Sequence, residues 1–406
     1  DKDLEDETRS FNDFNSYNKF FKEKGIIIDQ NKRREYIIRE IDKITLQKKI
    51  KINLNEKLVD EITNIVEKPK ILLCEFNEKF LEIPQEILII TMQTHQRYFP
   101  TFDNKNKITN NFIVVADCKD KRGFVRLGNQ NVVDARLTDA EFFWKKNKSQ
   151  SLVKQVSKLK DINYFKGLGS YFDKIQRVRK LSGTISDELL ISKEKIEIAS
   201  SICKVDLMSD LVGEFPELQG VMGGYFAQEQ GFDEEICLAI SEHYLPSGTD
   251  SRVPSKPYSI GLSLSDKIDS LVGFFGINLK PTSSKDPYAL RRMTISLIRL
   301  ILENKNKIKL RDLINYSINL YKEQNYSFDT KLINEELGEF ILERLKNYMK
   351  DNNIRSDIIE CSINSYGIDD LQKIYNKSSN LNKNIKKDFG NDVIAIYKRS
   401  SNILNS

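Results

Sequence analysis

The sequence predicts an α+β multidomain protein in which a β-rich segment is followed by a mostly α-helical remainder. Between residues 67 and 150 the chain has short apolar runs rich in Ile, Val and Phe, separated by turn residues such as Pro84 and Gly123. Such runs are typical of strands. From about residue 151 onward, apolar residues recur at helical spacing instead, which is typical of amphipathic helices.

Helices are also expected before the β-rich segment, because Ile37, Ile41 and Ile44 share one helical face. Pro69 should end the last of these helices. Strands are expected at 71–76, 87–92, 97–102 and 111–117, followed by a helix over 131–147. The expected domains are a partial N-terminal helical region at 1–66, a β-rich domain at 67–150, a helical domain at 151–310 and further helices at 311–406.

The composition excludes several classes of protein. Hydrophobic residues make up 39% of the chain and charged residues 30%, so it is neither wholly disordered nor short of core material. No run approaches the roughly 18 apolar residues of a membrane span, and the first residues lack a signal-peptide pattern. Five scattered cysteines without a CxxC pair indicate a reduced, cytoplasmic protein. Because the sequence does not begin with Met, we expect a piece of a longer chain.

Charge is distributed unevenly along the chain. Residues 141–180 contain eleven Lys or Arg and three Asp or Glu, whereas residues 201–250 contain ten acidic residues and one basic residue. One interpretation is that both segments form solvated helix faces. The other is a basic face that binds phosphate and a separate acidic face. Charge alone does not decide between them.

His243 is the first candidate site, because it is one of only two histidines and precedes the acidic run at 266–269. Helical domains of the HD phosphohydrolase type hold a divalent metal with several histidines and aspartates. Asp206 stands where the aspartate of their His-Asp pair would be, but Val205 precedes it, and Asp266 would be the distant aspartate. Such hydrolysis needs imidazole ligands, which carboxylates alone do not replace. The sequence therefore predicts no metal site, with His243 as a hydrogen-bonding residue at a helix end.

Two further stretches are candidates for recognition. His95, Gln96 and Arg97 lie at a corner between two expected strands, where they form either an ordered turn or a polar surface that recognises a nucleotide or a partner. In residues 278–292, Thr282, Ser283 or Ser284 is expected to cap a helix whose first turn contains Asp286 and Pro287. Free amides at that helix start attract phosphate, and Lys285, Arg291 and Arg292 add positive charge. The alternative is that Asp286 and the arginines form structural ion pairs.

Six stretches then occur in a characteristic order: THQRYF (94–99), VVDARLTDAEFFW (132–144), GLGSYFDK (167–174), GEFPELQGVMGGYFA (213–227), EHYLP (242–246) and PTSSKDPYALRR (281–292). Together they resemble the beta subunit of bacterial glycyl-tRNA synthetase, in the form built from two alpha and two beta subunits. The tail AIYKRSSNIL (395–404) looks like the opening helix of that subunit's anticodon-binding domain. The resemblance extends from about residue 70 onward and is weaker before it.

This resemblance implies a function. In the family, the alpha subunit carries the catalytic core, which uses ATP and Mg²⁺ to activate glycine, and the beta subunit recognises tRNA(Gly). The chain is then expected to hold no catalytic residue, metal or cofactor of its own and to support glycylation by the alpha subunit. The resemblance also implies an editing-type-like domain at 67–150, a degenerate HD-like domain at 151–310 and a truncated anticodon-binding domain near the end. Asp206, His243 and Asp266 would be relics of the HD site.

The groups expected to contact tRNA are basic: Lys285, Arg291 and Arg292, with Lys398 and Arg399 at the start of the anticodon module and the lysines of 145–180 as a diffuse supplement. Two other functions stay open. One is an HD-type metal-dependent phosphohydrolase acting on nucleotides, which metal analysis and a phosphatase assay would reveal. The other is a scaffold for the alpha dimer without tRNA contact, which tRNA-binding assays with and without alpha would reveal.

Overall fold

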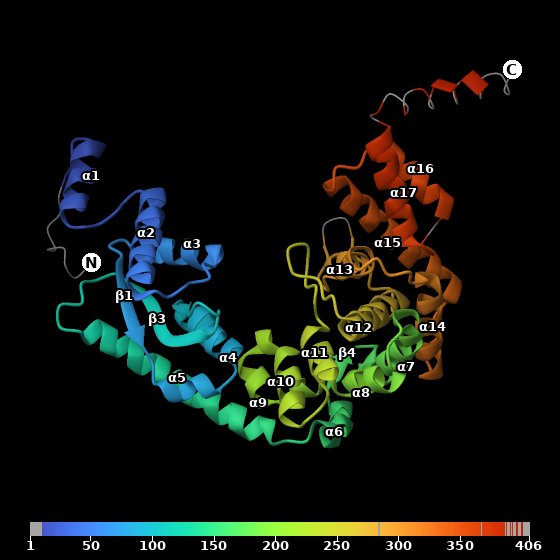
Figure 1. Cartoon of the computed structure of the whole chain (residues 1–406), viewed down its shortest axis with the longest axis horizontal. Coiled ribbons are helices and arrows are strands. Elements are labelled where there is room, and N and C mark those ends of the chain that lie inside the picture. Colours follow the sequence, from blue (N-terminus) through green and yellow to red (C-terminus); the bar gives the residue numbers. More distant parts are fainter. Residues whose placement is uncertain are drawn as a thin grey trace. The chain divides into compact units, whose positions relative to one another are not determined.

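The computed structural model of the chain describes residues 10–282, 285–366 and 368–385, and seven single residues beyond them (387, 390, 392, 395, 396, 399 and 400) (Figure 1). The chain divides into two compact units. The first consists of Asp1–Asn147 and Glu214–Leu218, and the second of Lys148–Gly213 and Gln219–Ser406. Within the described ranges, no helix combines the length and apolar character needed to cross a membrane.

The first unit is built around a small antiparallel sheet. Its strands β1 (Lys70–Glu75), β2 (Phe99–Phe102) and β3 (Ile108–Ala116) lie in the order β1-β3-β2, with Lys70 opposite Ala116 and Phe99 opposite Ile113. The helices that precede it are α1 (Phe14–Glu23), α2 (Gln30–Lys48) and α3 (Glu56–Ile65), and the long α5 (Phe124–Lys148) follows. The short elements between β1 and β2 are η1 (Glu78–Glu82), α4 (Gln85–Ile90) and a π-helical turn, η2 (Thr91–His95), and η5 (Pro216–Leu218) belongs to the same unit.

The first unit's helices begin and pack as the sequence pattern indicates. Asp29 caps α2 by accepting a hydrogen bond from the backbone N–H of Lys32, and Asn55 caps α3 in the same way. The apolar faces of α2 and α3 pack on the sheet in one buried cluster, which contains Ile37, Ile41, Leu58, Val59, Ile62, Val66, Phe99 and Ile113. The expected helices before the sheet and three of the four expected strands are therefore confirmed.

The expected strand at 87–92 is wrong, because this run forms α4 and η2. Pro84 stands at the helix start, where its fixed φ and missing N–H are compatible with the first turn. Ile87, Leu88 and Met92 are buried on one helical face. A short apolar run reads equally well as a strand or a buried helix, so periodicity did not separate the two.

The second unit is almost entirely helical. Its main helices are α7 (Tyr171–Leu189), α8 (Lys193–Ile202), α10 (Val221–Glu229), α11 (Glu234–Glu242), α12 (Pro257–Gly276), α13 (Leu290–Glu303), α14 (Leu310–Glu323), α15 (Thr330–Asp351), α16 (Ser356–Tyr366) and α17 (Leu371–Asn384). Shorter elements are α6 (Leu152–Gln155), η3 (Val156–Asp161), η4 (Val205–Met208) and α9 (Asp210–Glu214). Helix α12 contacts α7, α11, α13, α14 and α15, which surround it in Figure 1.

A two-stranded hairpin, β4 (Asn163–Phe165) with β5 (Gly169–Ser170), departs from the expected all-helical second half. Gly167 and Gly169 both have positive φ, which glycine adopts at low cost. Ser170 and Asp173 then form a capping box that starts α7. The GLGS run therefore turns a hairpin into a capped helix.

Helix α12 forms the centre of this unit because every residue from Ser259 to Phe275 is buried. A Cβ on Gly273 would lie only 2.2 Å from the Tyr321 hydroxyl oxygen, so the glycine lets α14 approach closely. The chain as a whole is mostly helical with one small three-stranded sheet near its N-terminus, which confirms the α+β prediction at that level. The identities and boundaries of the expected domains stay predictions.

Candidate functional site

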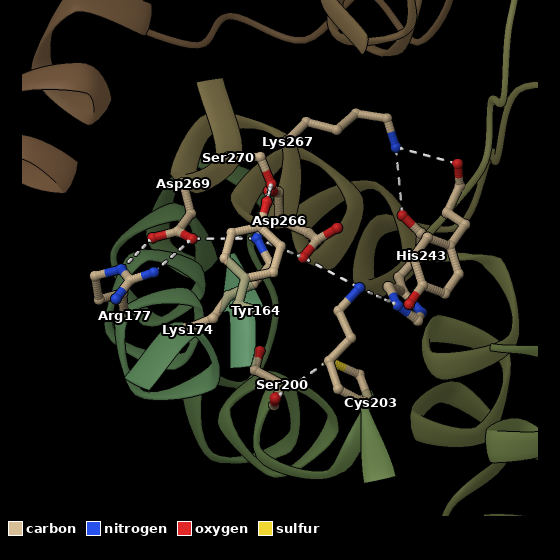
Figure 2. A network of polar contacts seen from close by, with 12 residues as sticks. Tyr164, Lys174, Arg177, Ser200, Cys203, His243, Asp266, Lys267, Asp269 and Ser270 are labelled. Atoms are coloured by element: carbon tan, nitrogen blue, oxygen red, sulfur yellow. Dashed lines mark hydrogen bonds and ion pairs between the residues drawn. The ribbon is translucent and has the colours of Figure 1, made fainter. Parts of the chain in front are cut away.

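The candidate site is a network of charged side chains buried inside the second unit (Figure 2). Helix α12 supplies Asp266, Asp269 and Ser270, which share one face because they are three and four residues apart. Asp269 is fully buried, and Asp266 and Ser270 are nearly so. Burying carboxylates in this way costs several kcal/mol per ion unless cations and hydrogen bonds compensate them.

Helix α7 supplies two of the compensating cations. Arg177 forms a two-pronged contact with Asp269, with Nε 2.7 Å from Oδ1 and Nη2 3.3 Å from Oδ2, and its guanidinium lies over the Tyr321 ring. Lys174 Nζ bridges both carboxylates, 3.1 Å from Asp269 Oδ2 and 3.2 Å from Asp266 Oδ1, and donates to Ser270 Oγ at 2.7 Å. Lys174 and Arg177 are both 1% exposed, so these pairs are sealed from water.

The third cation, Lys204, comes from the residue just before η4. Its Nζ lies 3.2 Å from Asp266 Oδ1, 2.8 Å from His243 Nε2 and 3.8 Å from the centre of the Tyr244 ring. His243 follows the last residue of α11, and its Nδ1 lies 2.6 Å from the Ile240 carbonyl oxygen. A carbonyl only accepts and an ammonium only donates, so Nδ1 carries the proton and Nε2 accepts from Lys204. His243 is therefore a neutral imidazole with both nitrogens engaged.

The electrostatics of the network follow from burial and pairing. Burial alone would raise the pKa of Asp266, but the ammonium groups of Lys174 and Lys204 hold it well below its usual range. Burial disfavours the charged form of Lys174, yet Asp266 and its other partners raise the pKa of that amine overall. Burial, followed by the charge of Lys204, lowers the pKa of His243 well below its usual range. At neutral pH Asp266, Lys174 and Lys204 are charged and the imidazole is neutral.

Lys267 completes the site from the other side of α12. Its Nζ lies 3.2–3.3 Å from the carbonyl oxygens of His243, Tyr244 and Leu245, and 2.8 Å from Ser263 Oγ. It thus donates hydrogen bonds to carbonyl oxygens just after α11, where the helix dipole favours a cation. Because burial outweighs the attraction of Asp266, the pKa of Lys267 is lowered to about 7.

The structure brings together two of the three expected HD relics. His243 and Asp266 face each other with Lys204 between them. Asp206 serves a different purpose: its Oδ2 accepts hydrogen bonds from the backbone N–H groups of Gly220 (2.5 Å) and Gly223 (3.1 Å) at the start of α10. Burial raises the pKa of Asp206 to about 6, against these hydrogen bonds. The side chain therefore fixes a helix start, as in a buried N-cap.

The arrangement does not fit a catalytic metal. The imidazole lone pair that a metal requires accepts a hydrogen bond from Lys204 instead. The ammonium groups of Lys174 and Lys204 both already lie beside Asp266 Oδ1. Across the residues that the structure describes, no group of three or more His, Cys, Asp or Glu side chains is arranged to hold a metal ion. Two lysine side chains supply the positive charge here, and the geometry argues against the phosphohydrolase interpretation.

The basic segment at 285–292 differs from the expected phosphate site. Helix α13 begins at Leu290, about one turn later than expected, and Asp286 accepts from the N–H groups of Leu290 and Arg291 at 2.9 Å. A carboxylate thus already occupies the amides expected to bind phosphate. Arg291 donates to the Thr282 carbonyl oxygen, whereas Arg292 and Lys285 are exposed. The expected helix start is therefore wrong, and Ser283 and Ser284 lie outside the described residues.

The remaining candidates are distributed over both units. Arg399 is exposed, and Lys398 lies outside the described residues. Arg97 has a positive φ and pairs with Glu61, and Tyr98 donates to Asn129, so the stretch after η2 forms an ordered turn. His95 is half-buried, with its ring 5.3 Å from that of Phe215. Whether His95, Gln96 and Arg97 recognise a ligand stays a prediction.

The basic segment at 141–180 is not one solvated face. Lys174 and Arg177 are inside the network, and Lys148 and Lys180 pair with Glu229 and Glu323. The exposed lysines of this segment are those at residues 145, 146, 154, 158, 160, 166 and 180. Spacing could have indicated that Lys174 and Arg177 are paired. These two residues on α7 are three positions apart, as are their partners Asp266 and Asp269 on α12, so each pair shares one helical face.

These features define a class of protein: a mostly helical chain of two units, in which the second unit encloses a buried network of lysine, arginine, aspartate and histidine side chains. Comparison with known proteins then identifies the family. The family described as glycyl-tRNA synthetase beta subunit matches residues 2–364, and the chain belongs to it.

Similar relatives carry the name glycine–tRNA ligase beta subunit. The protein of Rickettsia canadensis (strain McKiel) is 36% identical over 392 residues, which cover 96% of this chain and 57% of the relative. The protein of Syntrophomonas wolfei is 35% identical, covering 95% and 56%, and that of Stutzerimonas stutzeri is 38% identical, covering 81% and 48%. The chain thus spans about half the length of the curated relatives it matches.

Proposed function

We propose that the chain is the tRNA-recognising part of a glycyl-tRNA synthetase beta subunit and supports ATP-dependent glycylation of tRNA(Gly) by a separate alpha subunit. The observation that carries this proposal is membership of the beta subunit family over residues 2–364. The proposal places the chain in the cytoplasm with two partners, the alpha subunit and tRNA(Gly). ATP and Mg²⁺ are used by the alpha subunit.

The chemistry of the buried network supports a non-catalytic role for this chain. A catalytic group must reach the substrate, but Lys174, Asp269 and His243 are at most 1% exposed. The side chains also satisfy one another, so none is poised to take a proton from a substrate. We therefore assign the network to the stability of the helical unit that carries the recognition surface.

Exposed cations support the tRNA contact. Lys285 and Arg292 near the start of α13 and Arg399 near the end of the chain are exposed, as phosphate contacts require. A-form RNA offers mainly phosphates and 2′-hydroxyl groups to a helical surface, so these contacts are read by shape more than by base identity. Binding then releases counterions and weakens steeply as salt is added.

The proposal is tested by purifying the chain with and without the alpha subunit and adding labelled tRNA(Gly). We expect the chain to bind tRNA by itself and to co-purify with alpha. With ATP, glycine and tRNA, the chain without alpha should form no glycyl-tRNA. Robust product from a preparation free of alpha would overturn the non-catalytic assignment, and absence of tRNA binding would favour the scaffold interpretation.

A further inference from the structure

An open pocket of about 520 Å³ lies in the first unit, between the residues that precede β1 and the loop that joins β3 to α5. Its lining includes Lys68 on one side and Lys119, Lys121 and Arg122 on the other, with Phe124 among the apolar groups. Ligand pockets commonly measure about 300–1,000 Å³, so this one is large enough for a nucleotide.

The pocket carries a surplus of positive charge. It is lined by four cations and one acid, Asp120. The Asp120 carboxylate accepts hydrogen bonds from the backbone N–H groups of Val125 and Arg126 at the start of α5, at 3.1 and 3.2 Å. Within the described residues, no ion pair is found for Lys119, Lys121 or Arg122, and all three are exposed. These cations are therefore available to an anionic partner.

Other surface arginines of the same unit contrast with this loop. Arg34 pairs with Glu56 and Asp60, and Arg97 pairs with Glu61. Surface ion pairs of this kind neutralise the local field and leave little attraction for a ligand. The loop at 119–122 thus concentrates uncompensated charge beside a concave surface, which raises the local concentration of anions.

The two sides of the pocket are held together by hydrogen bonds to the Asp117 side chain. Asp117, just after β3, accepts hydrogen bonds from the N–H groups of Glu67 and Lys68 at 2.8 and 2.7 Å. Gly123 has φ +75° and lets the loop turn directly into α5. The cationic loop is therefore anchored at both ends, next to the segment that carries Lys68.

An aromatic ring lies beside these cations. Phe124 is 66% exposed at the first position of α5, and Leu127 one turn further is 53% exposed. Proteins bind unpaired nucleotides by combining a cationic groove for the backbone with aromatic rings on which bases stack, and each stacked base contributes about 1–3 kcal/mol. Cations alone would suit an acidic protein equally well, but a single exposed ring at the rim of a nucleotide-sized cationic pocket favours RNA.

We propose that this pocket binds an unpaired segment of tRNA, with phosphates on Lys119, Lys121 and Arg122 and a base stacked on Phe124. The inference rests on the proposed function and assigns part of the RNA contact to the first unit, far in sequence from α13. Unpaired segments are where proteins reach the faces of RNA bases, since paired A-form helices hide them.

The test compares the 406-residue chain with the variants K119Q/K121Q/R122Q and F124A. The matched control K57Q/K105Q/K107Q removes the same charge from exposed lysines of the same unit. Affinities for tRNA(Gly) and for a fully paired RNA duplex of the same length are measured at several salt concentrations. The triple variant should bind tRNA about tenfold more weakly, and its salt slope should fall by about two to three, because each lost phosphate contact lowers it by about one.

F124A should weaken tRNA binding at least about fivefold and leave duplex binding unchanged, because only unpaired bases stack on the ring. Phe124 is mostly exposed, so this variant tests the inference even if the triple variant fails to fold. Three results would overturn the inference. If the wild-type chain does not bind tRNA, the proposed function fails with it. If the wild type binds and the variants match the control, only the pocket assignment fails. Co-purification of each variant with the alpha subunit is measured as well: if the variants still bind tRNA but no longer bind alpha, the pocket is a protein interface.

Discussion

The Nζ atom of Lys204 lies 2.8 Å from Nε2 of His243, so a lysine ammonium takes the lone pair with which an imidazole binds a metal. The same ammonium lies 3.2 Å from Asp266 Oδ1. A fixed positive charge thus stands between the histidine and the aspartate, in the position relative to them that a divalent ion would need. The charges of the buried lysines and aspartates around α12 balance one another, and the predictions below follow from that balance.

The Asp266→Asn variant should be strongly destabilised. Asp266 Oδ1 is shared by the ammonium groups of Lys174 and Lys204, both 3.2 Å away. In the variant Lys174 still pairs with Asp269, but the buried charge of Lys204 loses its carboxylate. Removing one partner of a buried ion pair costs about 3–5 kcal/mol. Urea unfolding measures the loss. Asp233→Asn is the control, since Asp233 pairs with Lys195 at the surface and should change stability by less than about 1 kcal/mol. Equal stabilities for the two variants would refute the assignment.

The purified chain should contain well under one equivalent of Mn, Fe, Zn or Ni. Lys174 and Lys204 already supply the positive charge beside Asp266, and a metal would have to displace both. Elemental analysis after gentle purification gives the answer. Tight binding that is lost in both His243→Ala and Asp266→Ala would contradict the prediction and revive the phosphohydrolase interpretation.

His243 should make the folded chain less stable in mild acid. Burial and the charge of Lys204 lower the pKa of His243 in the folded state, whereas the unfolded chain takes up a proton there below about pH 6.5. The unfolded state then binds more protons, so stability falls as pH drops from about 7 to 5. Asp206, whose pKa is raised to about 6, acts in the opposite direction between about pH 4 and 6.

The variant His243→Gln isolates the histidine contribution, because Asp206 titrates in both proteins. Melting temperatures at pH 5, 6 and 7 should fall less on acidification in the variant than in the wild type. If the melting temperature falls equally in the variant and the wild type between pH 7 and 5, the imidazole of the wild-type chain is not held neutral by Lys204.

The two neighbouring arginines at the start of α13 should have different roles, one in stability and the other in tRNA binding. The Arg291 guanidinium donates to the Thr282 carbonyl oxygen, and Arg291→Gln removes this hydrogen bond, so the variant should have a lower melting temperature. Arg292 is exposed, so Arg292→Gln should leave the melting temperature unchanged and weaken tRNA binding with a salt slope reduced by about one. A folded Arg292→Gln variant with undiminished affinity and slope would remove this residue from the tRNA surface.

The sequence indicated most of the fold but little of the network. His243 and Asp266 stood out because histidine is rare in this chain and the acidic run was visible, and the structure does bring them together. Lys174 and Arg177 were read as part of a basic surface because they lie among eleven basic residues. Their partner Asp269 is more than ninety positions away, and local charge counting does not detect pairing at that separation.

Two local errors have the same origin. The apolar run at 87–92 is too short to show a period, so its pattern fits a strand as well as the helical turns that the structure has there. The start of α13 was placed near Asp286 because serine and threonine preceded it, whereas the structure uses the Asp286 side chain to hold the first amides of a helix that begins at Leu290. In both cases the local sequence pattern is compatible with two conformations.

The affinity of the chain for tRNA(Gly), measured with and without the alpha subunit at two salt concentrations, tests the central claim most directly. Recognition of tRNA by this chain predicts binding in the absence of alpha, with an affinity that falls steeply as salt rises because Lys and Arg release counterions from the phosphates. Binding that appears only when alpha is present, with no salt-dependent affinity in the chain itself, would contradict the account and make the chain a scaffold.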